Sequence, residues 1–540
     1  MVGSTTIEFR SSMRRQMSKP WLRVAVILGA FAFITTASPG ADAGTSNRCA
    51  GDDRLEHLVV IFDENVSFDH YFGTYPRADP PFSAKPDTPS VDGLNTSGLW
   101  EKNPNSTKPF LLRRDQYATS DQDHDYTAEQ EAFDNGLMDL FPESTGQTGN
   151  GPDYGKGTGI VMGVYDGNTV TALWNYAQNF AMSDNSFGTT FGPSTPGALN
   201  LIAGRTGLVT GSNGKSSTGY LAHGAAGDVL IDDADPLGDV CANPDMYQAR
   251  LSGKNIGDLL TESKITWGWF EGGFRIDPSK QQCSSAHNNK MGKSKLDYVA
   301  HHEPFQYFES TANLKHTPPT DDNLIGTDRD GAKHQYDLRD FFPALEHGHL
   351  PTVSFLKAPA YHDGHAGYSD PLDEQTFLVD TINRIESSKD WDHTAIVIMW
   401  DDSDGWYDHV MGPIVSQSDT DADSLSGSQA HKPSHMCGTA KPDASSQGRC
   451  GYGPRLPFLI VSPFSKINFV DHSVTDQSSV IRYIEDRWLG GSRLGTGSTD
   501  EIAGSLCNML DFKRTRHADP IFLDRDAGTQ IPRSKLRLAE

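Results

Sequence analysis

Three features are scarce or missing in this chain of 540 residues, and each narrows what the protein can do. Lysine and arginine number 46 against 71 aspartates and glutamates, which gives a formal net charge of -25. Because repulsion opposes encounter with polyanions, nucleic acid and anionic membrane surfaces are disfavoured as partners. No apolar run approaches the about 20 residues that a membrane span needs. The spacings CxxC and CxxH are missing, which argues against a structural zinc cluster.

The first 43 residues have the layout of an export signal. Basic residues precede an apolar run at 24–34, and small residues at 41–43 form a cleavage sequence. The adjacent arginines at 14 and 15 fit either a twin-arginine signal or an ordinary secretion signal. Cleavage predicts an exported domain at 44–540, in the periplasm or outside the cell, with no transmembrane anchor.

The six cysteines all follow the predicted cleavage point. An even number of cysteines in an exported chain predicts disulfide bonds. The pairs closest in sequence are favoured, although other connectivities stay open: Cys437 with Cys450, Cys241 with Cys283, and then Cys49 with Cys507.

Unbroken apolar runs alternate with helical patterns along the chain. The runs at 58–62, 353–356, 395–400 and 458–461 are typical of strands buried on both faces, as in a parallel sheet. Apolar residues recur at helical spacing within 377–385 and 480–488, and Gly490 is placed to end the second helix. This order predicts a single α/β domain, with a mostly parallel central sheet covered by helices on both faces. Polar stretches near 88–107, 210–254 and 415–449 read as loop insertions.

Acidic and amide side chains follow two of the predicted strands directly. Glu64 and Asn65 come after the first run, and Asp401 and Asp402 come after the third. Because parallel strands end at one edge of a sheet, these side chains are expected to meet there. Adjacent buried carboxylates are costly unless a cation offsets their repulsion. The pattern therefore predicts a site for a hard divalent ion, with two polar turns as the plain alternative.

The segment FGPSTPGALNLIAG places a serine at the start of a predicted helix. Ser194 is expected at the N-cap, with Pro196 in the first turn. A hydroxyl there lies near free backbone N–H groups and the positive end of the helix dipole, which favour a phosphate and a developing alkoxide. Alone, the pattern fits an ordinary capping serine, and Thr195 is the neighbouring candidate for the same chemistry.

Histidines occur in three polar segments, and none has a zinc-protease spacing such as HExxH. Taken one at a time, each reads as a surface or hydrogen-bonded histidine. They are His124, His301, His302, His362 and His365.

Six motifs occur in an order that resembles the bacterial phosphoesterase family. They are ENVSFDHYFGTYP, GPSTPGALN, AHHEPF, DGHAGYSDP, DDSDGWYDHV and GPRLPFLIVSPFSK followed by DQSSVIRYIEDRW. That family contains haemolytic and non-haemolytic phospholipases C and a branch of acid phosphatases. The resemblance implies an alkaline phosphatase-like three-layer sandwich with one divalent metal ion, whose identity the sequence leaves open. The implied metal ligands are Glu64, Asn65, Ser194, Asp401 and Asp402.

The same resemblance assigns the catalytic groups. Ser194 is the implied nucleophile, and His365 or His302 the implied proton donor to the leaving group. Four histidines and Asn65 would surround the phosphate: His124, His301, His302 and His365. His362 falls outside the matched positions and reads as a supporting or structural residue.

Two departures from the phospholipase C pattern bear on the substrate. Those enzymes read GPTxPNR and YDExxG where this chain has GPSTPGA and WDDSDG. The sequence therefore predicts an exported acid phosphatase that hydrolyses phosphate monoesters through a phosphoserine and is most active in mild acid. Phospholipase C, acting on phospholipid diesters, is the alternative within the family. A non-catalytic, calcium-stabilised secreted protein is the alternative from another class.

Overall fold

A sheet of eight strands crosses the centre of the molecule. The computed structural model describes residues 52–538 apart from 148–156, 277–282, 284, 426–433, 440, 443, 445–446, 496 and 514–517. In spatial order the strands are β14 (Gln335–Asp337), β11 (Trp267–Glu271), β15 (Val353–Lys357), β1 (His57–Asp63), β16 (Thr394–Trp400), β17 (Phe458–Val461), β4 (Ala181–Ser183) and β18 (Phe469–Asp471). All four predicted strands belong to this sheet.

The sheet is mostly parallel, as predicted. Strands β14, β11, β15, β1 and β16 all run in the same direction, and β4 runs parallel to β18. Strand β17 is antiparallel to both of its neighbours, β16 and β4. Its apolar run correctly predicted a buried strand, but burial on both faces does not encode direction.

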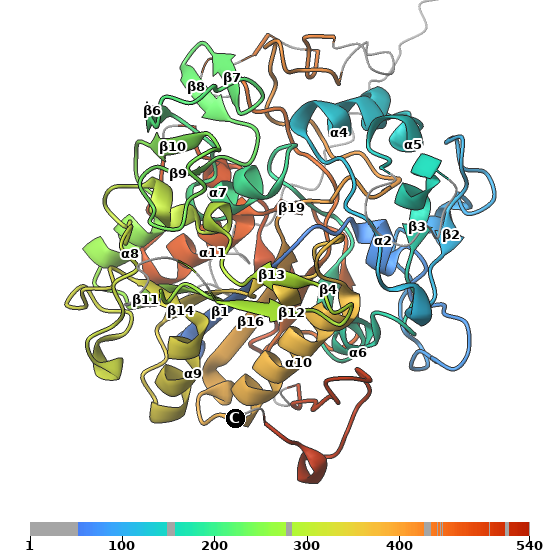
Figure 1. The fold of residues 1–540 in the computed structure, drawn as a ribbon. Coiled ribbons are helices and arrows are strands. Elements are labelled where there is room, and N and C mark those ends of the chain that lie inside the picture. The colour runs from blue at the N-terminus through green and yellow to red at the C-terminus, as the bar shows by residue number, and fades with distance from the viewer. Residues whose placement is uncertain are drawn as a thin grey trace, which may run out of the picture. The chain divides into compact units, whose positions relative to one another are not determined.

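Helices cover both faces of the sheet (Figure 1). In β1, Leu58, Val60 and Phe62 face one core, while Val59 and Ile61 face the other, because successive side chains of a strand alternate. Helices α6 (Thr171–Asn179), α9 (Leu338–His347) and α10 (Pro371–Ser387) pack on the Val59 side, and α7 (Ser194–Ala203), α8 (Ile256–Glu262) and α11 (Ser478–Trp488) on the Leu58 side. This is the predicted three-layer α/β sandwich, and α10 and α11 are the two predicted helices.

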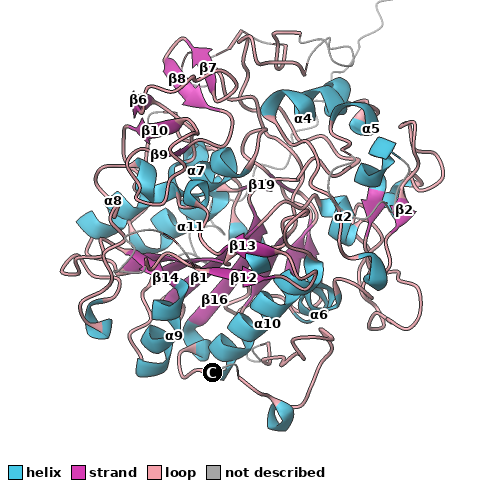
Figure 2. Ribbon diagram, in the orientation of Figure 1, coloured by secondary structure: helices cyan, strands magenta, loops and turns pink. Residues whose placement is uncertain are grey.

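Shorter elements surround the sandwich (Figure 2). The remaining helices are α2 (Phe68–Phe72), α3 (Leu94–Ser97), α4 (Tyr126–Phe133) and α5 (Phe141–Ser144). The remaining strands are β2 (Phe110–Leu111), β3 (Gly163–Val164), β5 (Ser186–Phe187), β6 (Val209–Ser212), β7 (Leu221–Gly224), β8 (Gly227–Leu230), β9 (Asp235–Pro236), β10 (Gln248–Leu251), β12 (Ala286–Asn288), β13 (Ser294–Leu296) and β19 (Thr475–Asp476).

Five of these strands, β6 to β10, lie in or at the edge of the 210–254 stretch expected to be a loop insertion. Each has only two to four residues, too few for an alternating pattern to stand out in the sequence. The described part of 415–449 contains no helix or strand and makes only isolated bridges, as between Ser418 and Cys437. All described residues fall in one compact unit, while the limits 44–540 stay a prediction.

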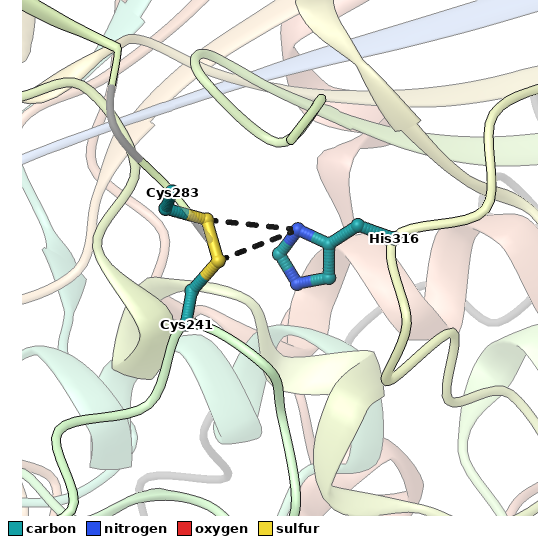
Figure 3. Close-up of side chains that lie close together, drawn as sticks. All are labelled: Cys241, Cys283 and His316. Carbon is teal, nitrogen blue, oxygen red and sulfur yellow. Dashed lines mark hydrogen bonds between the residues drawn. A yellow bond between two sulfur atoms is a disulfide. The ribbon is translucent and has the colours of Figure 1, made fainter. Parts of the chain in front are cut away.

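Two of the predicted disulfides are confirmed. Cys241 bonds to Cys283, and Cys437 bonds to Cys450. Figure 3 shows the buried His316 ring beside the first of them, with Nδ1 at 3.8 and 3.9 Å from the two sulfur atoms. The third predicted pair includes Cys49, which lies outside the described residues, as does the predicted export signal. Among the described helices, none combines the length and the apolar character that crossing a bilayer requires.

Candidate active site

The carboxyl ends of β1 and β16 bring two acidic segments together. The strands pair in parallel, with Asp63 opposite Trp400, so the residues that follow them meet. The Asp401 amide donates to the Asp63 carbonyl at 3.2 Å, and the Asn65 amide donates to Asp401 Oδ1 at 3.0 Å. The predicted convergence of Glu64, Asn65, Asp401 and Asp402 at one sheet edge is therefore present.

Ser194 lies at this edge, but it does not cap its helix. Helix α7 begins at Ser194 itself, Pro193 occupies the cap position, and no side chain makes a capping hydrogen bond there. The Ser194 hydroxyl lies 3.1 Å from Glu64 Oε2 and 3.2 Å from Asp402 Oδ2. The expected N-cap was wrong by one residue, because Pro193, with extended backbone, occupies the cap position. The shift directs the hydroxyl at the carboxylates rather than at its own helix.

The neighbouring Thr195 faces elsewhere. Its amide donates to Asp233 Oδ1 at 2.9 Å, and its buried hydroxyl makes no hydrogen bond with any described residue. Of the two hydroxyl candidates, Ser194 is the one that contacts Glu64 and Asp402 among the described residues.

Gly197 allows helix α7 to reach the sheet edge. A Cβ at this position would lie 2.2 Å from the Asp401 carbonyl oxygen and 3.0 Å from the Asp401 Cα. Both neighbours are backbone atoms and cannot turn away. Only glycine fits this approach, which places Ser194, three residues earlier, against Asp402.

The buried acidic cluster has the properties of a cation site. Glu64, Asn65, Asp401 and Asp402 are all 2% exposed or less. Burial, and then repulsion from Asp401, raise the pKa of both Glu64 and Asp402 well above the ordinary range. No described residue donates a hydrogen bond to Asn65 Oδ1 or Asp401 Oδ2. Three carboxylates, an amide oxygen and a hydroxyl are donors of the kind that hard divalent ions prefer, so the five predicted ligands fit such an ion.

The sequence did not single out Lys357, which lies on the far side of Glu64 from Ser194. Its ammonium group contacts Glu64 Oε1 and lies 3.8 Å from Asp401 Oδ2. The same Glu64 oxygen lies 3.2 Å from His302 Nδ1. One signal was available: Lys357 directly follows the predicted strand 353–356, just as Asp63 and Asp401 follow theirs.

His124 and His301 lie among carboxylates. Burial lowers the pKa of His124, but Asp402 and Asp404 outweigh it and raise the pKa well above the ordinary value. The His124 Nε2 atom lies 3.3 Å from Nδ2 of the Asn65 side chain. For His301, burial likewise lowers the pKa, but Asp233 raises it above the ordinary value overall. Both rings therefore favour the imidazolium form.

His302 and His365 behave in the opposite way. Burial, and then the Lys357 charge, lower the pKa of His302 well below its usual range. Burial lowers the pKa of His365 to about 4, and its Nδ1 lies 2.6 Å from the Ala366 carbonyl oxygen. The two groups expected to protonate a leaving group are thus neutral in mild acid in the substrate-free protein.

The four matched histidines come from three segments that converge. The His124 and His365 rings lie 6.0 Å apart, and the His301 and His302 rings 4.7 Å apart. His362 Nε2 lies 4.0 Å from Asp373 Oδ1, and its supporting or structural role stays a prediction. An open cavity of about 530 Å³ borders His124, and its walls include Asp121, Asp123, Asp125 and Tyr368.

Asp408 and His409 follow the acidic pair in sequence but belong to a different network. Arg455 Nε contacts both oxygens of Asp408 at 3.1 Å, and Arg455 Nη2 contacts Asp69 at 3.2 Å. His409 Nδ1 lies 2.6 Å from Asp69. This buried set of paired charges joins three of the six motifs. The pairing of acidic with basic side chains explains the burial of these residues without a metal ion.

Two phospholipases C are similar to this chain in sequence. Non-hemolytic phospholipase C of Pseudomonas aeruginosa is 24% identical over 441 residues, covering 80% of this chain and 54% of that protein. Phospholipase C B of Mycobacterium tuberculosis is 23% identical over 546 residues, covering 96% of this chain and 89% of that protein. The chain thus spans about half the length of the Pseudomonas relative.

A solved structure described as a protein in the alkaline phosphatase superfamily from Vibrio parahaemolyticus aligns with 59% of this chain and 60% of its own. The alignment has 13% identity and a TM-score of 0.25. The sequence profile of the phosphoesterase family matches residues 55–489 and includes every residue of the site described above. The chain belongs to the phosphoesterase family.

Proposed function

We propose that this protein is an exported phosphoesterase that hydrolyses phosphate monoesters through a phosphoserine on Ser194. One observation carries the proposal: the Ser194 hydroxyl, in the first residue of α7, lies within 3.2 Å of both Glu64 and Asp402. A serine that only capped the helix would direct its oxygen at the amides of its own first turn. Here the Thr195 amide already donates to Asp233 and Pro196 has no N–H, so the first turn offers a bound phosphate the positive end of the helix dipole rather than a set of free amides.

Five side chains would hold one divalent ion: Glu64, Asn65, Ser194, Asp401 and Asp402. When bound, the ion would lower the pKa of the serine hydroxyl and offset negative charge on the phosphoryl oxygens. The donor set favours a hard cation such as Mg²⁺, Mn²⁺ or Ca²⁺. Oxidising compartments preserve disulfides, and the two described disulfides support a periplasmic or secreted location.

The protein's own groups account for both chemical steps. Ser194 passes its hydroxyl proton to Glu64 or Asp402, whose oxygens lie 3.1 and 3.2 Å away, as its Oγ attacks phosphorus. The bond from phosphorus to the leaving oxygen breaks, and His302 or His365 gives that oxygen a proton. Water then attacks the phosphoserine from the opposite side and releases phosphate, and the carboxyl group returns its proton to Ser194 Oγ. The same histidine removes the proton from that water.

The histidines with raised pKa values and those with lowered pKa values have different proposed roles. His124 and His301, whose pKa values are raised by carboxylates, supply fixed positive charge to a phosphate dianion. His302 and His365 are neutral before substrate binds, and the charge of the dianion raises their pKa values toward the working pH. Activity is therefore expected to be highest in mild acid, where the most histidines are protonated.

Phospholipase C activity is the second candidate, because the relatives carry that name. It would use the same serine on a phosphodiester and release a diacylglycerol. The acidic cavity wall formed by Asp121, Asp123 and Asp125 disfavours leaving groups that carry further phosphates, whichever ester is cleaved.

A substrate panel separates the candidates. The purified protein is assayed from about pH 5 to 8 against p-nitrophenyl phosphate, bis-p-nitrophenyl phosphate and phosphatidylcholine, with elemental analysis of each preparation. A monoesterase prefers the first substrate, with an acidic optimum. Preference for phosphatidylcholine would identify a phospholipase C. A bound ion without turnover of any ester would identify a calcium-stabilised, non-catalytic protein.

A further inference from the structure

Lys357 occupies the middle of the carboxyl edge of the sheet. It ends β15, opposite Glu271 at the end of β11 in the strand register, and its other neighbour strand is β1. The side chain is 1% exposed, and its ammonium lies 4.9 Å from the centre of the Phe62 ring. Removing a lysine from water this completely is costly unless anionic groups compensate its charge.

Five buried carboxyl groups converge on this lysine: Asp63, Glu64, Glu271, Asp363 and Asp401. Burial raises the pKa of Glu271 to about 8 and that of Asp363 to about 7, and the Lys357 charge acts against this rise in both. Within the described part of the chain, no other lysine or arginine pairs with any of the five within 4.0 Å.

The lysine also touches a set of ligand atoms that could hold a cation. Glu64, His302 and Asp363 are buried and each offer one ligand atom within 4.8 Å of the others. Glu64 Oε1, which lies 3.2 Å from His302 Nδ1, is the atom that the ammonium contacts. The other Glu64 oxygen faces Ser194 at 3.1 Å. Glu64 thus presents Oε1 to Lys357 and Oε2 to the proposed metal site.

We propose that Lys357 is a positioning residue whose ammonium fills a fixed cation position beside Glu64, His302 and Asp363. It limits the site to one divalent ion and holds Glu64 with Oε2 toward Ser194. The inference rests on the proposed function, because it takes the Ser194 side of Glu64 as the metal site. A lysine whose only role is to offset the negative charge of buried carboxylates would not affect how many ions bind.

The test counts Mn²⁺ ions by equilibrium dialysis and elemental analysis in the full protein, together with kcat for p-nitrophenyl phosphate. The variants are Lys357→Met, which keeps the length of the chain without its charge, and Lys357→Arg, which keeps a cation. Lys215→Met is the control, because Lys215 is 47% exposed and, among the described residues, pairs with the exposed Asp245. Wild type, Lys357→Arg and Lys215→Met are expected to bind one ion. Lys357→Met is expected to bind two, or one at least tenfold more tightly, with kcat lowered at least tenfold.

One ion of unchanged or weaker affinity in a folded Lys357→Met protein overturns the inference. If that variant unfolds, thermal denaturation with and without millimolar Mn²⁺ decides the matter. Recovery of the fold by Mn²⁺ supports a vacated cation position, and failure of Mn²⁺ to restore it overturns the inference. Failure of the wild type to bind Mn²⁺ would instead refute the proposed metal site, so the two failures are distinguishable.

Discussion

Replacing Gly197 with alanine tests how closely helix α7 must approach the sheet edge. The new Cβ would lie 2.2 Å from the Asp401 carbonyl oxygen, whereas ordinary contact begins at 3.4 Å, so the first turn must retreat by roughly 1 Å. A misplacement of about 1 Å in a catalytic group costs on the order of 100-fold in rate. We therefore expect kcat for p-nitrophenyl phosphate to fall about 100-fold as the Ser194 contact with Asp402 lengthens.

Stability should change much less than activity in this variant. Overpacking costs about 1–3 kcal/mol, and the better helix propensity of alanine offsets up to about 1 kcal/mol of it. Gly331→Ala is the control, because its Cβ would meet nothing closer than a Thr317 methyl at 4.0 Å. Thermal denaturation and kcat are measured side by side. Wild-type kcat in a folded Gly197→Ala protein would refute the claim that this close approach positions Ser194.

Three further variants test the buried charges of Arg455, His409 and Asp402. Arg455→Leu leaves Asp69 and Asp408 buried without their guanidinium, so urea denaturation should show a loss of about 3–5 kcal/mol; a loss under about 1 kcal/mol would contradict the pairing. Burial lowers the pKa of His409, but Asp69 outweighs this effect and raises the pKa to about 10. Protonated His409 therefore adds at most about 5 kcal/mol to the free energy of unfolding. That contribution is complete below about pH 6.5 and is lost as the pH rises through 10. A His409→Asn protein should therefore lose less stability over this pH interval than wild type does. Equal slopes of unfolding free energy against pH in the two proteins would contradict the assignment. Asp402→Asn should abolish bound metal in elemental analysis, and unchanged metal content would remove Asp402 from the ligand set.

The sheet core and the acidic edge were predictable because their signals are local. Unbroken apolar runs at 58–62 and 395–400 have few alternatives to buried strands, and the residues after them must then lie at a strand end. The strands β14 and β4 have only three residues each, which is too few for a pattern. The direction of β17 depends on the route of the chain between strands, which a single apolar run does not record.

The electrostatic differences within the site were not predictable from the residues alone. His301 and His302 are adjacent in sequence, yet one faces Asp233 and the other lies near Lys357, so their pKa values shift in opposite directions. The four histidines looked equivalent in the sequence because the charges that distinguish them come from distant segments. The direction of the Ser194 hydroxyl likewise depends on the approach of α7 to Asp401.

The most direct test of the account is to trap the phosphorylated protein. Wild type and Ser194→Ala are mixed with p-nitrophenyl phosphate in mild acid, quenched with strong acid during turnover, digested and analysed by mass spectrometry. A phosphoserine mechanism at Ser194 predicts a phosphoryl group on that residue in the wild type, none on Thr195, and neither phosphorylation nor turnover in Ser194→Ala. Turnover in Ser194→Ala, or a phosphoryl group on Thr195, would contradict it.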